Sequence, residues 1–536
     1  MRLKLLIVVF LYSIVSEGQI LTFDFVGLSG DEVSASSNYN DINLNSSTIT
    51  RGSGLTASLN SDRFNSINWA TASIANAVTG NNYIEFTITP KTEYQFSVSS
   101  IVFLWQRSGT GSTAIALRSS IDGYATNLDS QKAIVDNTST QTFTFSFTQI
   151  NTSSPVTYRL YGYSEAAGGS AGPEGIGNDI VVNGNVSLIG PYSVTSGDWN
   201  NPSTWSTNTV PLSSENVTIS SGHTVYTNIS LTRNKITKVD GAFELRDGGW
   251  ATGIGTFIYN GTTGTLNFNL SSGSYGVNNS DVYWPTSNGP FNVNVLNAGM
   301  NLNSGANRTV NGLFTTANAG TSNVSFPNAT LTLNGTCQIN LGGAFGSSPI
   351  FGNSSTLIYN SSGTYGRGYE WIHNGVGTIG VTPGYPNNVQ ISNNTTFNYT
   401  NGVPLNKAIA GNLTIDSGSS FYMDYGSVSA TGYLTIAGNL VNNGNLTLGY
   451  AIGDDLKIGG NFTNTGNFDG KNRAIFFLKN GVQTVFSNTT LTIPYVVFQP
   501  ASGSTTVQLL SDVIVSAPSG GNAISFNNSG DIFDLN

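Results

Sequence analysis

Apolar and polar residues alternate in short runs along almost the whole chain. In NYIEFTIT, Ile84, Phe86 and Ile88 fall on one face of an extended strand, while Glu85 and Thr87 fall on the other. Gly, Asn and Ser separate the runs, and beyond the N-terminus no run keeps the 3.6-residue spacing of a helix for longer than about one turn. The pattern predicts an all-β protein.

The first part of the chain has the longest alternating runs, among them QFSVSSIVFLW, QTFTFSFT and VTYRLYGYS. Long strands with one apolar face are typical of antiparallel sheets that cover a core on one side only. We therefore expect a jelly-roll β-sandwich over residues 19–189. The pair Gly190-Pro191 interrupts the pattern and marks the boundary.

A tryptophan-rich stretch follows this boundary. Trp199 and Trp205 stand six residues apart, ahead of the predicted strands ENVTI and HTVYT. A stack of parallel coils presents unpaired backbone groups at its open end and needs a cover there. We expect residues 190–235 to form a segment that caps a solenoid.

A shorter repeat dominates the second half of the chain. GNLVNNGNLTLG begins at residue 438 and GNFTNTGNFDGK at residue 460, a shift of 22 residues that suits one coil of a parallel β-helix. Leu434 and Ile436 point inward in one coil, and Leu456 and Ile458 in the next. Asn residues at the corners can stack on their counterparts along the axis. The competing interpretation is a row of hairpins, because Asn-Gly pairs also favour hairpin turns. We expect β-solenoid repeats over residues 236–536.

A longer repeat joins TFIYNGTTG at residue 256 to TLIYNSSGTYG at residue 356. A residue pair that ends in tryptophan follows each copy, Tyr283-Trp284 and Glu370-Trp371, and then come the related phrases GPFNVNVLN and YPNNVQISN. AIFFLKNGVQTVF, from Ala474, reads as a third copy. We interpret the copies as openings of larger modules, with mixed coil and hairpin structure around residues 265–310 and 360–405.

The N-terminus has the pattern of a secretory signal peptide. Arg2 and Lys4 precede an apolar stretch from Leu5 to Val15, and small residues predict cleavage after Gly18, so residues 1–18 are the expected signal. No other stretch has the length of a transmembrane segment. The single cysteine, Cys337, excludes an internal disulfide in the exported chain.

The composition argues against nucleic acid as a partner. Charged residues make up 9% of the chain and the net charge is −9, so there is no basic stripe to displace counterions from phosphates. The scattered acidic residues indicate a solvated surface.

Phrases from both parts of the chain resemble large secreted surface proteins of Bacteroidota, typically exported by the type IX route. The resemblance rests on ILTFDFVGLSG and GNDIVVNGNV in the first part, and on TLIYNSSGTYGRGYEW and AGNLTIDSGS in the second. It implies a C-terminal sorting domain read by the export machinery. This chain ends instead at NNSGDIFDLN, in what reads as a truncated coil. Either a sorting domain lies downstream of a fragment, or export and anchoring differ.

Residues suited to catalysis are few. A polysaccharide-degrading β-helix enzyme, a lyase or glycoside hydrolase, needs carboxylates that converge with a base or a metal ion. Asp454, Asp455, Lys457 and Asp469 are the only local group of that kind, and His223 precedes them in an order that does not match the polygalacturonase pattern. Corner carboxylates beside Gly are usually solvated turn residues.

Metal binding has little support in the sequence. Two histidines and one cysteine make no zinc spacing, and no catalytic metal or other cofactor is predicted. Asp24, Asp31 and Asp179 are candidate ligands of a structural calcium ion in the sandwich, although roles at turns and strand ends explain them equally well.

Binding of glycans has better support. Trp105 and Arg107 share a face of one predicted strand, and Arg159, Tyr161 and Tyr163 share a face of another. Sugar rings dock on exposed aromatic faces, although the same rings could belong to the sandwich core. We predict a non-enzymatic surface protein that adheres to extracellular glycans or another surface ligand. The alternatives are the β-helix enzyme and a passive spacer for a missing C-terminal domain.

Overall fold

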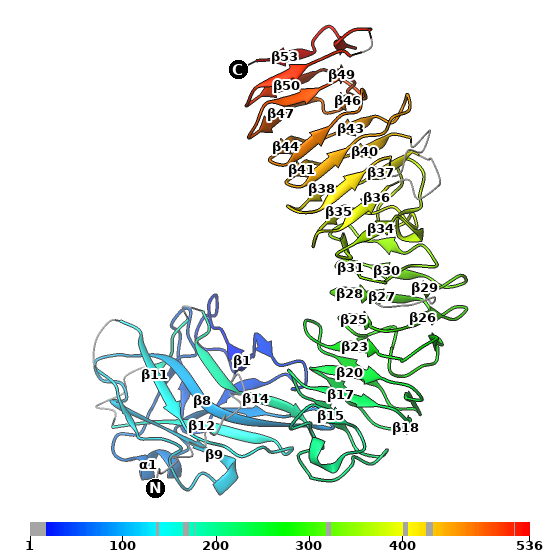
Figure 1. Ribbon diagram of the computed structural model, residues 1–536. Coiled ribbons are helices and arrows are strands. Elements are labelled where there is room, and N and C mark those ends of the chain that lie inside the picture. The colour runs from blue at the N-terminus through cyan, green and yellow to red at the C-terminus, as the bar shows by residue number, and fades with distance from the viewer. Residues whose placement is uncertain are drawn as a thin grey trace, which may run out of the picture. The chain divides into compact units, whose positions relative to one another are not determined.

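The computed structural model describes residues 18–135, 139–164, 171–175, 177–317, 323–399, 406–424, 432–518 and 520–535 (Figure 1). The predicted signal peptide lies outside these ranges, apart from Gly18. The chain divides into two compact units, Met1–Ile189 and Gly190–Asn536, called here the sandwich and the solenoid. Antiparallel sheets form the first unit and parallel sheets the second, which confirms the predicted fold class.

The sandwich consists of two antiparallel sheets with a shared core. One sheet contains, in spatial order, β3 (Tyr39–Asn40), β1 (Gly18–Phe23), β14 (Ile180–Leu188), β8 (Tyr94–Arg107), β13 (Ala171–Pro173), β6 (Ser66–Ile67) and β5 (Thr56–Ala57), with β11 (Gln141–Ser146) also paired to β8. The other contains β10 (Lys132–Ala133), β9 (Ala114–Ser119), β12 (Val156–Tyr163), β7 (Tyr83–Ile88), β4 (Thr48–Arg51) and β2 (Ser34–Ser36). The alternation places Ile84, Phe86 and Ile88 in the core, as predicted.

A short helix covers part of the outer face of the second sheet. Helix α1 (Ile74–Thr79) begins at Ser73, whose side chain forms a capping box with Asn76. Its buried Ala77 belongs to a small separate cluster that also contains Tyr161 and Tyr163. The outer face of β12 is therefore not solvated where the helix packs. A second short helical turn, η1, spans Ser120–Asp122.

Each coil of the solenoid passes through three sides, and about 13 turns stack in parallel. The first side is one continuous sheet of 15 strands: β15 (Gly197–Asp198), β17 (Thr224–Thr227), β20 (Ala242–Leu245), β23 (Thr265–Phe268), β25 (Asn292–Val295), β28 (Leu313–Thr316), β31 (Thr336–Asn340), β33 (Thr356–Asn360), β35 (Asn388–Ile391), β38 (Leu413–Ile415), β41 (Leu440–Asn442), β44 (Phe462–Asn464), β47 (Gly481–Ser487), β50 (Thr505–Leu509) and β53 (Ile532–Asp534). Figure 1 shows these strands stacked along the whole solenoid.

The second side is broken into four sheets. They are β18 (Ser230–Thr232) with β21 (Trp250–Thr252); β24 (Ser274–Val277), β26 (Gly299–Leu302) and β29 (Val324–Ser325); β34 (Thr364–Gly366), β36 (Thr396–Asn398), β39 (Ser420–Tyr422), β42 (Asn445–Thr447) and β45 (Asn467–Asp469); and β48 (Leu491–Ile493) with β51 (Val513–Val515).

The third side is broken into three sheets. They are β16 (Val217–Ile219), β19 (Thr237–Val239) and β22 (Phe257–Tyr259); β27 (Arg308–Val310), β30 (Leu331–Leu333) and β32 (Ile350–Phe351); and β37 (Lys407–Ile409), β40 (Leu434–Ile436), β43 (Leu456–Ile458), β46 (Ala474–Phe477), β49 (Tyr495–Phe498) and β52 (Ile524–Phe526). The breaks on the two sides decide where grooves open, as described below.

The predicted register of the coils is confirmed. Leu434 pairs in parallel with Leu456, and Leu440 with Phe462 at the predicted shift of 22 residues, with all four side chains buried. In the described part of the solenoid every pair of named strands is parallel, so the hairpin alternative is wrong there, including in the described residues of the stretches where mixed structure was expected.

Asparagines at the corners link successive coils, as predicted. The backbone N–H of Asn412 donates to Oδ1 of Asn388 at 2.9 Å, and those of Asn439 and Asn461 donate to the preceding Asn at 2.7 and 2.8 Å. Each amide thus satisfies a backbone donor that the turn leaves free of strand pairing.

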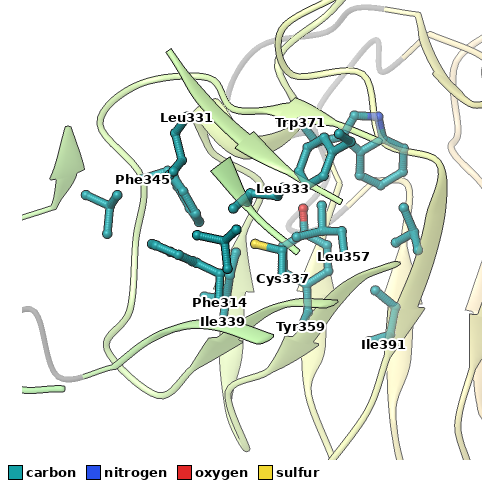
Figure 2. Packing of buried hydrophobic residues seen from close by; sticks show 14 of the residues in the cluster. Phe314, Leu331, Leu333, Cys337, Ile339, Phe345, Leu357, Tyr359, Trp371 and Ile391 are labelled. Atoms are coloured by element: carbon teal, nitrogen blue, oxygen red, sulfur yellow. The ribbon is translucent and has the colours of Figure 1, made fainter. Parts of the chain in front are cut away.

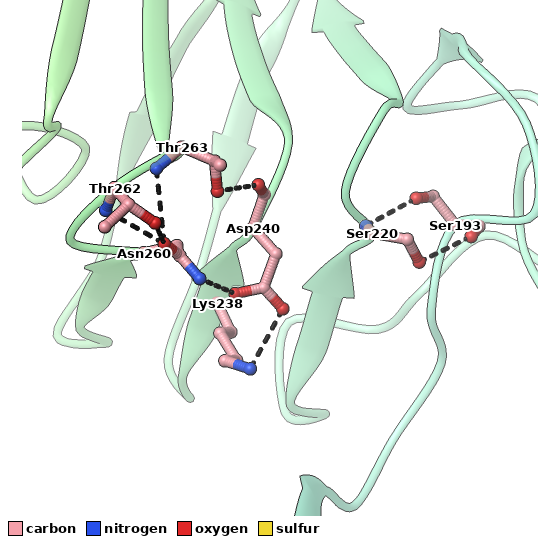
Figure 3. A network of polar contacts seen from close by, with 7 residues as sticks. All are labelled: Ser193, Ser220, Lys238, Asp240, Asn260, Thr262 and Thr263. Atoms are coloured by element: carbon pink, nitrogen blue, oxygen red, sulfur yellow. Dashed lines mark hydrogen bonds and ion pairs between the residues drawn. The ribbon is translucent and has the colours of Figure 1, made fainter. Parts of the chain in front are cut away.

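Another corner carries a network of side chains that crosses several coils (Figure 3). Ser220 donates its N–H to Oγ of Ser193 at 2.8 Å, Lys238 pairs with Asp240 at 2.9 Å, and Asn260 Nδ2 donates to Asp240 at 3.5 Å. These contacts fix the turns between the third and first sides of successive coils.

The tryptophan pair lies in the core at the first end of the 15-stranded sheet. Trp199 and Trp205 are buried edge to face, with ring centroids 4.9 Å apart, and Trp199 also meets Phe243 at 6.1 Å. The turn η2 (Pro202–Thr204) lies between them. Strands β16, β17 and β18 already form a coil inside the predicted capping segment 190–235, so the solenoid begins earlier than residue 236.

The longer repeat is real, but its copies align differently from the sequence prediction. TLIYN is strand β33 on the first side, whereas TFIYN holds β22 on the third side. The structural counterpart of TLIYNSSGTYG is TLNFNLSSGSYG, from Thr265, which forms β23 and β24 as the later copy forms β33 and β34. Periodicity alone missed the nine-residue offset because both phrases are strands with similar residues.

The tryptophans of these two pairs explain this repeat. In both copies the coil lacks a third-side strand, and a buried tryptophan takes its place: Trp284 in the first copy, and Trp371 in the turn η3 (Tyr369–Trp371) in the second. Trp284 lies 5.8 Å from Phe268, and Trp371 stacks on Phe397 at 6.0 Å. The indoles fill the volume that strand side chains fill elsewhere.

A buried cation follows each of these breaks. Arg308 begins β27 at an inward position and donates to the carbonyl of Asn278 at 2.8 Å. Lys407 begins β37 in the same way and donates to the carbonyl of Ile372 at 2.6 Å. A missing strand leaves backbone carbonyls without partners, and the cations satisfy them.

Candidate functional site

The sandwich does not expose the predicted aromatic platform. Trp105 is fully buried between the sheets, with its ring edge to face against Trp69 at 5.6 Å. Tyr161 and Tyr163 point away from that core but are buried in the cluster beneath α1, and Tyr161 meets Tyr83 at 5.3 Å. The expectation that a sugar stacks on these rings is therefore corrected: helix α1 and the facing sheet cover them.

The two predicted arginines are engaged within the sandwich. Arg107 donates to four backbone carbonyls, among them those of Ile134 and Gly109 at 3.2 and 3.1 Å. Arg159 pairs with Glu85 at 2.7 Å, and its guanidinium lies 4.0 Å from the ring centre of Tyr83. The structure does not bring the five predicted residues together into one open site.

The carboxylate group considered for an enzyme holds turns in place. Asp454 is buried and accepts hydrogen bonds from two backbone N–H groups at 2.8 Å each, and Asp455 accepts a third at 2.9 Å. Lys457 lies 3.9 Å over the ring of Tyr433, and Asp469 pairs with Lys471. Each group is committed to a different local contact.

The aspartates considered for calcium have local hydrogen-bond partners. Asp179 is buried and accepts the N–H of Phe25 at 2.6 Å, and Asp24 accepts that of Val26 at 3.0 Å. Asp31 accepts a hydrogen bond from Ser29. Over the described ranges, no three His, Cys, Asp or Glu side chains gather as a metal-binding group. A calcium ion here stays a prediction.

Grooves open in the solenoid at the three breaks of the second side. Each is lined by one aromatic side chain that is about half exposed: Trp250 (45%), Tyr369 (51%) and Tyr450 (57%). The first lies where the sheet of β21 gives way to that of β24, the second between β29 and β34, and the third between β45 and β48. Where strands do not continue from one coil to the next, the surface is hollowed and an aromatic ring is left open to solvent.

The groove at Trp250 has a volume of about 540 Å³. Trp250 begins β21, directly after a turn in which Gly248 has a φ of +77° that only glycine adopts readily. Tyr275 lies on β24 in the next coil and donates its hydroxyl to the carbonyl of Gly249 at 3.1 Å. This hydrogen bond fixes the turn that precedes Trp250. All seven tryptophans of the chain lie in the described ranges, and the other six are buried.

Two carboxylates line this groove and no cationic side chain does. Asp247 is exposed and accepts the N–H of Ser271 at 3.0 Å; hydrogen bonding from Ser271 lowers the pKa of Asp247 below its ordinary value. Asp281 accepts the hydroxyl of Tyr283 and the N–H of Asn278, both at 2.7 Å. Asp247 is thus ionised at neutral pH, and Asp281 is held in one orientation.

The other two grooves differ in charge. The groove at Tyr369, about 340 Å³, is lined by Phe326, Pro327 and Pro383 beside serines, with no charged side chain. The groove at Tyr450, about 510 Å³, contains the pair Asp469 and Lys471, whose charges lie 2.6 Å apart and offset one another.

Sequence reasoning missed all three aromatic residues. They stand in Gly-rich phrases, DGGWATG, RGYEW and LGYAIGDD, where the alternation that identifies inward residues restarts after a turn. The sequence feature that could have indicated these exposed rings is an aromatic residue next to glycines in the turn of a coil.

An exposed ring flanked by hydrogen-bonding groups can hold a sugar by stacking and by bonds to its hydroxyls.

None of the helices in the described ranges has the length and apolar character needed to cross a bilayer. Comparisons with protein-family profiles, with curated proteins and with solved structures find no match to this chain.

Proposed function

We propose that the protein is an exported, non-enzymatic surface protein that binds extracellular glycans through the solenoid. The observation that carries the proposal is the coincidence of three features at each break of the second side: a groove, a half-exposed aromatic ring and neighbouring polar groups. The sandwich, where binding was first expected, then serves as a folded module of its own.

The spacing of the grooves supports an extended ligand. Five coil steps separate the coils of Trp250 and Tyr369, and three separate those of Tyr369 and Tyr450. At about 4.8 Å per step, the coils that carry the aromatic residues recur roughly 24 and 14 Å apart along the axis of the solenoid. A polysaccharide can contact several of these residues at once. After the first contact forms, the other sugar units are held at high effective concentration near the remaining grooves, so several weak contacts can give a stable complex.

The export part of the proposal rests on the N-terminal sequence, which has the pattern of a secretory signal peptide. The non-enzymatic part is supported by the contacts of the candidate carboxylates: Asp454 and Asp455 bind backbone groups in turns, and Asp469, which lines the groove at Tyr450, is paired with Lys471. A passive spacer would not require three half-exposed aromatic residues, each beside a groove of the solenoid.

The test measures binding of the full chain to a panel of soluble polysaccharides by affinity electrophoresis. We expect retardation by at least one of them, lost when Trp250, Tyr369 and Tyr450 are all changed to Ala. Thermal unfolding of the triple variant should be near that of the wild type, because the removed rings are half exposed.

A matched control changes Tyr39 and Tyr192 to Ala, two exposed aromatic residues that line none of these grooves. This variant should bind as the wild type does. Equal losses in both variants, or no retardation by any polysaccharide, would refute the proposal. Release of new reducing ends during incubation would favour the enzyme.

A further inference from the structure

The three grooves differ in charge, and this difference bears on which sugar each takes. The groove at Trp250 contains the carboxylates of Asp247 and Asp281 and no cation among its lining residues. Two arginines lie close in sequence or in contact but line no part of the groove: Arg246 pairs with Glu244 at 2.6 Å and stacks over Tyr226 at 3.5 Å, and Arg308 is buried, donates to the carbonyls of Asn278 and Asn307 and interacts electrostatically with Asp281.

The two carboxylates come from different segments that line the groove. Asp247 lies in the turn before Trp250, and Asp281 lies in the segment after β24. Tyr275, which lies between them in sequence, and Tyr283, which follows Asp281, also line the groove, with their rings edge to face at 5.9 Å. A sugar on the indole therefore has acidic groups from two segments of the chain, and aromatic residues, in the same groove.

We infer that the groove at Trp250 selects glycans with free amino groups, that is, oligomers of a hexosamine. An ammonium group is attracted by both carboxylates and by the face of an indole, whereas a uronate or sulfate is repelled by the same carboxylates. This inference rests on the proposed glycan binding and adds the class of sugar. The groove at Tyr369 has no charged side chain among its lining residues, so we expect no preference for amino sugars there.

The experiment uses the fluorescence of the full chain, because Trp250 is the exposed tryptophan and a bound sugar shields it. The probes are oligomers of glucosamine, of N-acetylglucosamine and of galacturonic acid, matched in length. We expect the glucosamine oligomer to bind about fivefold or more tightly than the acetylated one, the galacturonate oligomer to bind weakest, and added salt to narrow the differences.

The variant Asp247→Asn should lose about two- to fivefold in affinity for the glucosamine oligomer and little for the acetylated one, as expected for a partly exposed ion pair. Asp512→Asn makes the same charge change at an exposed position outside the grooves, and it should leave the affinities for both oligomers unchanged. Trp250→Ala should abolish the fluorescence response to every oligomer that binds here.

Two outcomes separate the inference from the proposed function. Equal binding of the acetylated and free oligomers, or equal effects of Asp247→Asn and Asp512→Asn, would overturn the preference for amino sugars while leaving glycan binding intact. Failure of the folded chain to bind any glycan, in solution or in the electrophoresis panel, would overturn both.

Discussion

Asn442 donates from Nδ2 to Oδ1 of Asn464 at 2.7 Å in the closed interior of the solenoid. Asn464 in turn donates to Oγ of Ser487 at 3.2 Å. These residues occupy the inward row of the first side that holds Ile391 and Ile415 in earlier coils. A polar row replaces an apolar one because neighbouring coils supply each other with hydrogen-bond partners.

Breaking this row at its middle should be costly. Asn464→Leu removes the partner of the buried hydroxyl of Ser487 and one of the two acceptors of Asn442 Nδ2, which keeps its bond to the carbonyl of Asn467. We expect a loss of about 1–3 kcal/mol in the free energy of unfolding. Changing Asn442, Asn464 and Ser487 together to Ile, Leu and Ala removes the unsatisfied groups and should cost less than the single change.

Urea unfolding followed by circular dichroism measures both variants. The control is Asn443→Ala at the exposed corner, with an expected effect within about 0.5 kcal/mol. A triple variant at least as unstable as Asn464→Leu would show that the row acts through packing rather than through paired polar groups.

Trp105 should matter for the stability of the sandwich and not for binding. Its ring is fully buried, so Trp105→Ala should destabilise the sandwich by about 3–5 kcal/mol, whereas exposed Tyr39→Ala should change stability by less than about 0.5 kcal/mol. Differential scanning calorimetry measures the transition. If Trp105→Ala keeps the wild-type stability but loses glycan binding, the site lies in the sandwich after all.

Much of the fold follows from local patterns. Alternation in YIEFTIT and the 22-residue return of Leu and Asn are properties of one strand or one coil, and the sequence carries them directly. The offset between TFIYN and TLIYN depends on which side of the coil each phrase occupies. That choice is made by Trp284 and Trp371, which replace strands through long-range packing that no local pattern encodes.

The site was harder to predict for the same reason. Tyr161 reads as an outward residue of β12, and only the six-residue helix α1 buries it. Trp250 reads as one more aromatic residue in a turn, and only the break between two sheets leaves it open. Exposure is decided by elements far from a residue in sequence, so alternation alone could not assign it.

Burial should make Lys407 a source of pH dependence. Desolvation lowers the pKa of Lys407 from 10.5 to about 8, which means that the folded state disfavours the charged form. Between these values the unfolded chain binds more protons than the folded one, so folding stability rises with pH from about 8 to 10.5. The penalty on the charged side chain is complete below pH 8 and is relieved above 10.5.

The measurement compares wild type with Lys407→Met in urea unfolding from pH 7 to 9.5. The free energy of unfolding of the wild type, relative to that of Lys407→Met, should increase as the pH rises, by at most about 1.4 kcal/mol per pH unit. Lys91→Met, at an exposed lysine of the sandwich, should show no such slope. A constant difference for Lys407→Met would mean that the side chain stays charged throughout.

The thiol of Cys337 should report opening of the central coils. Cys337 lies in the inward row of the first side between Phe314 and Leu357 and is fully buried (Figure 2). Burial raises the pKa of the thiol well above its ordinary value, so the reactive thiolate is both hidden and scarce. As the only cysteine of the chain, it gives an unambiguous signal with a thiol reagent.

We expect the folded chain to react far more slowly than the chain unfolded in urea, and at a rate set by opening of the coils. Cys337→Ala supplies the blank. Labelling in native buffer as fast as in urea would show that the central coils open independently of the rest, contrary to a stack stabilised by contacts between neighbours.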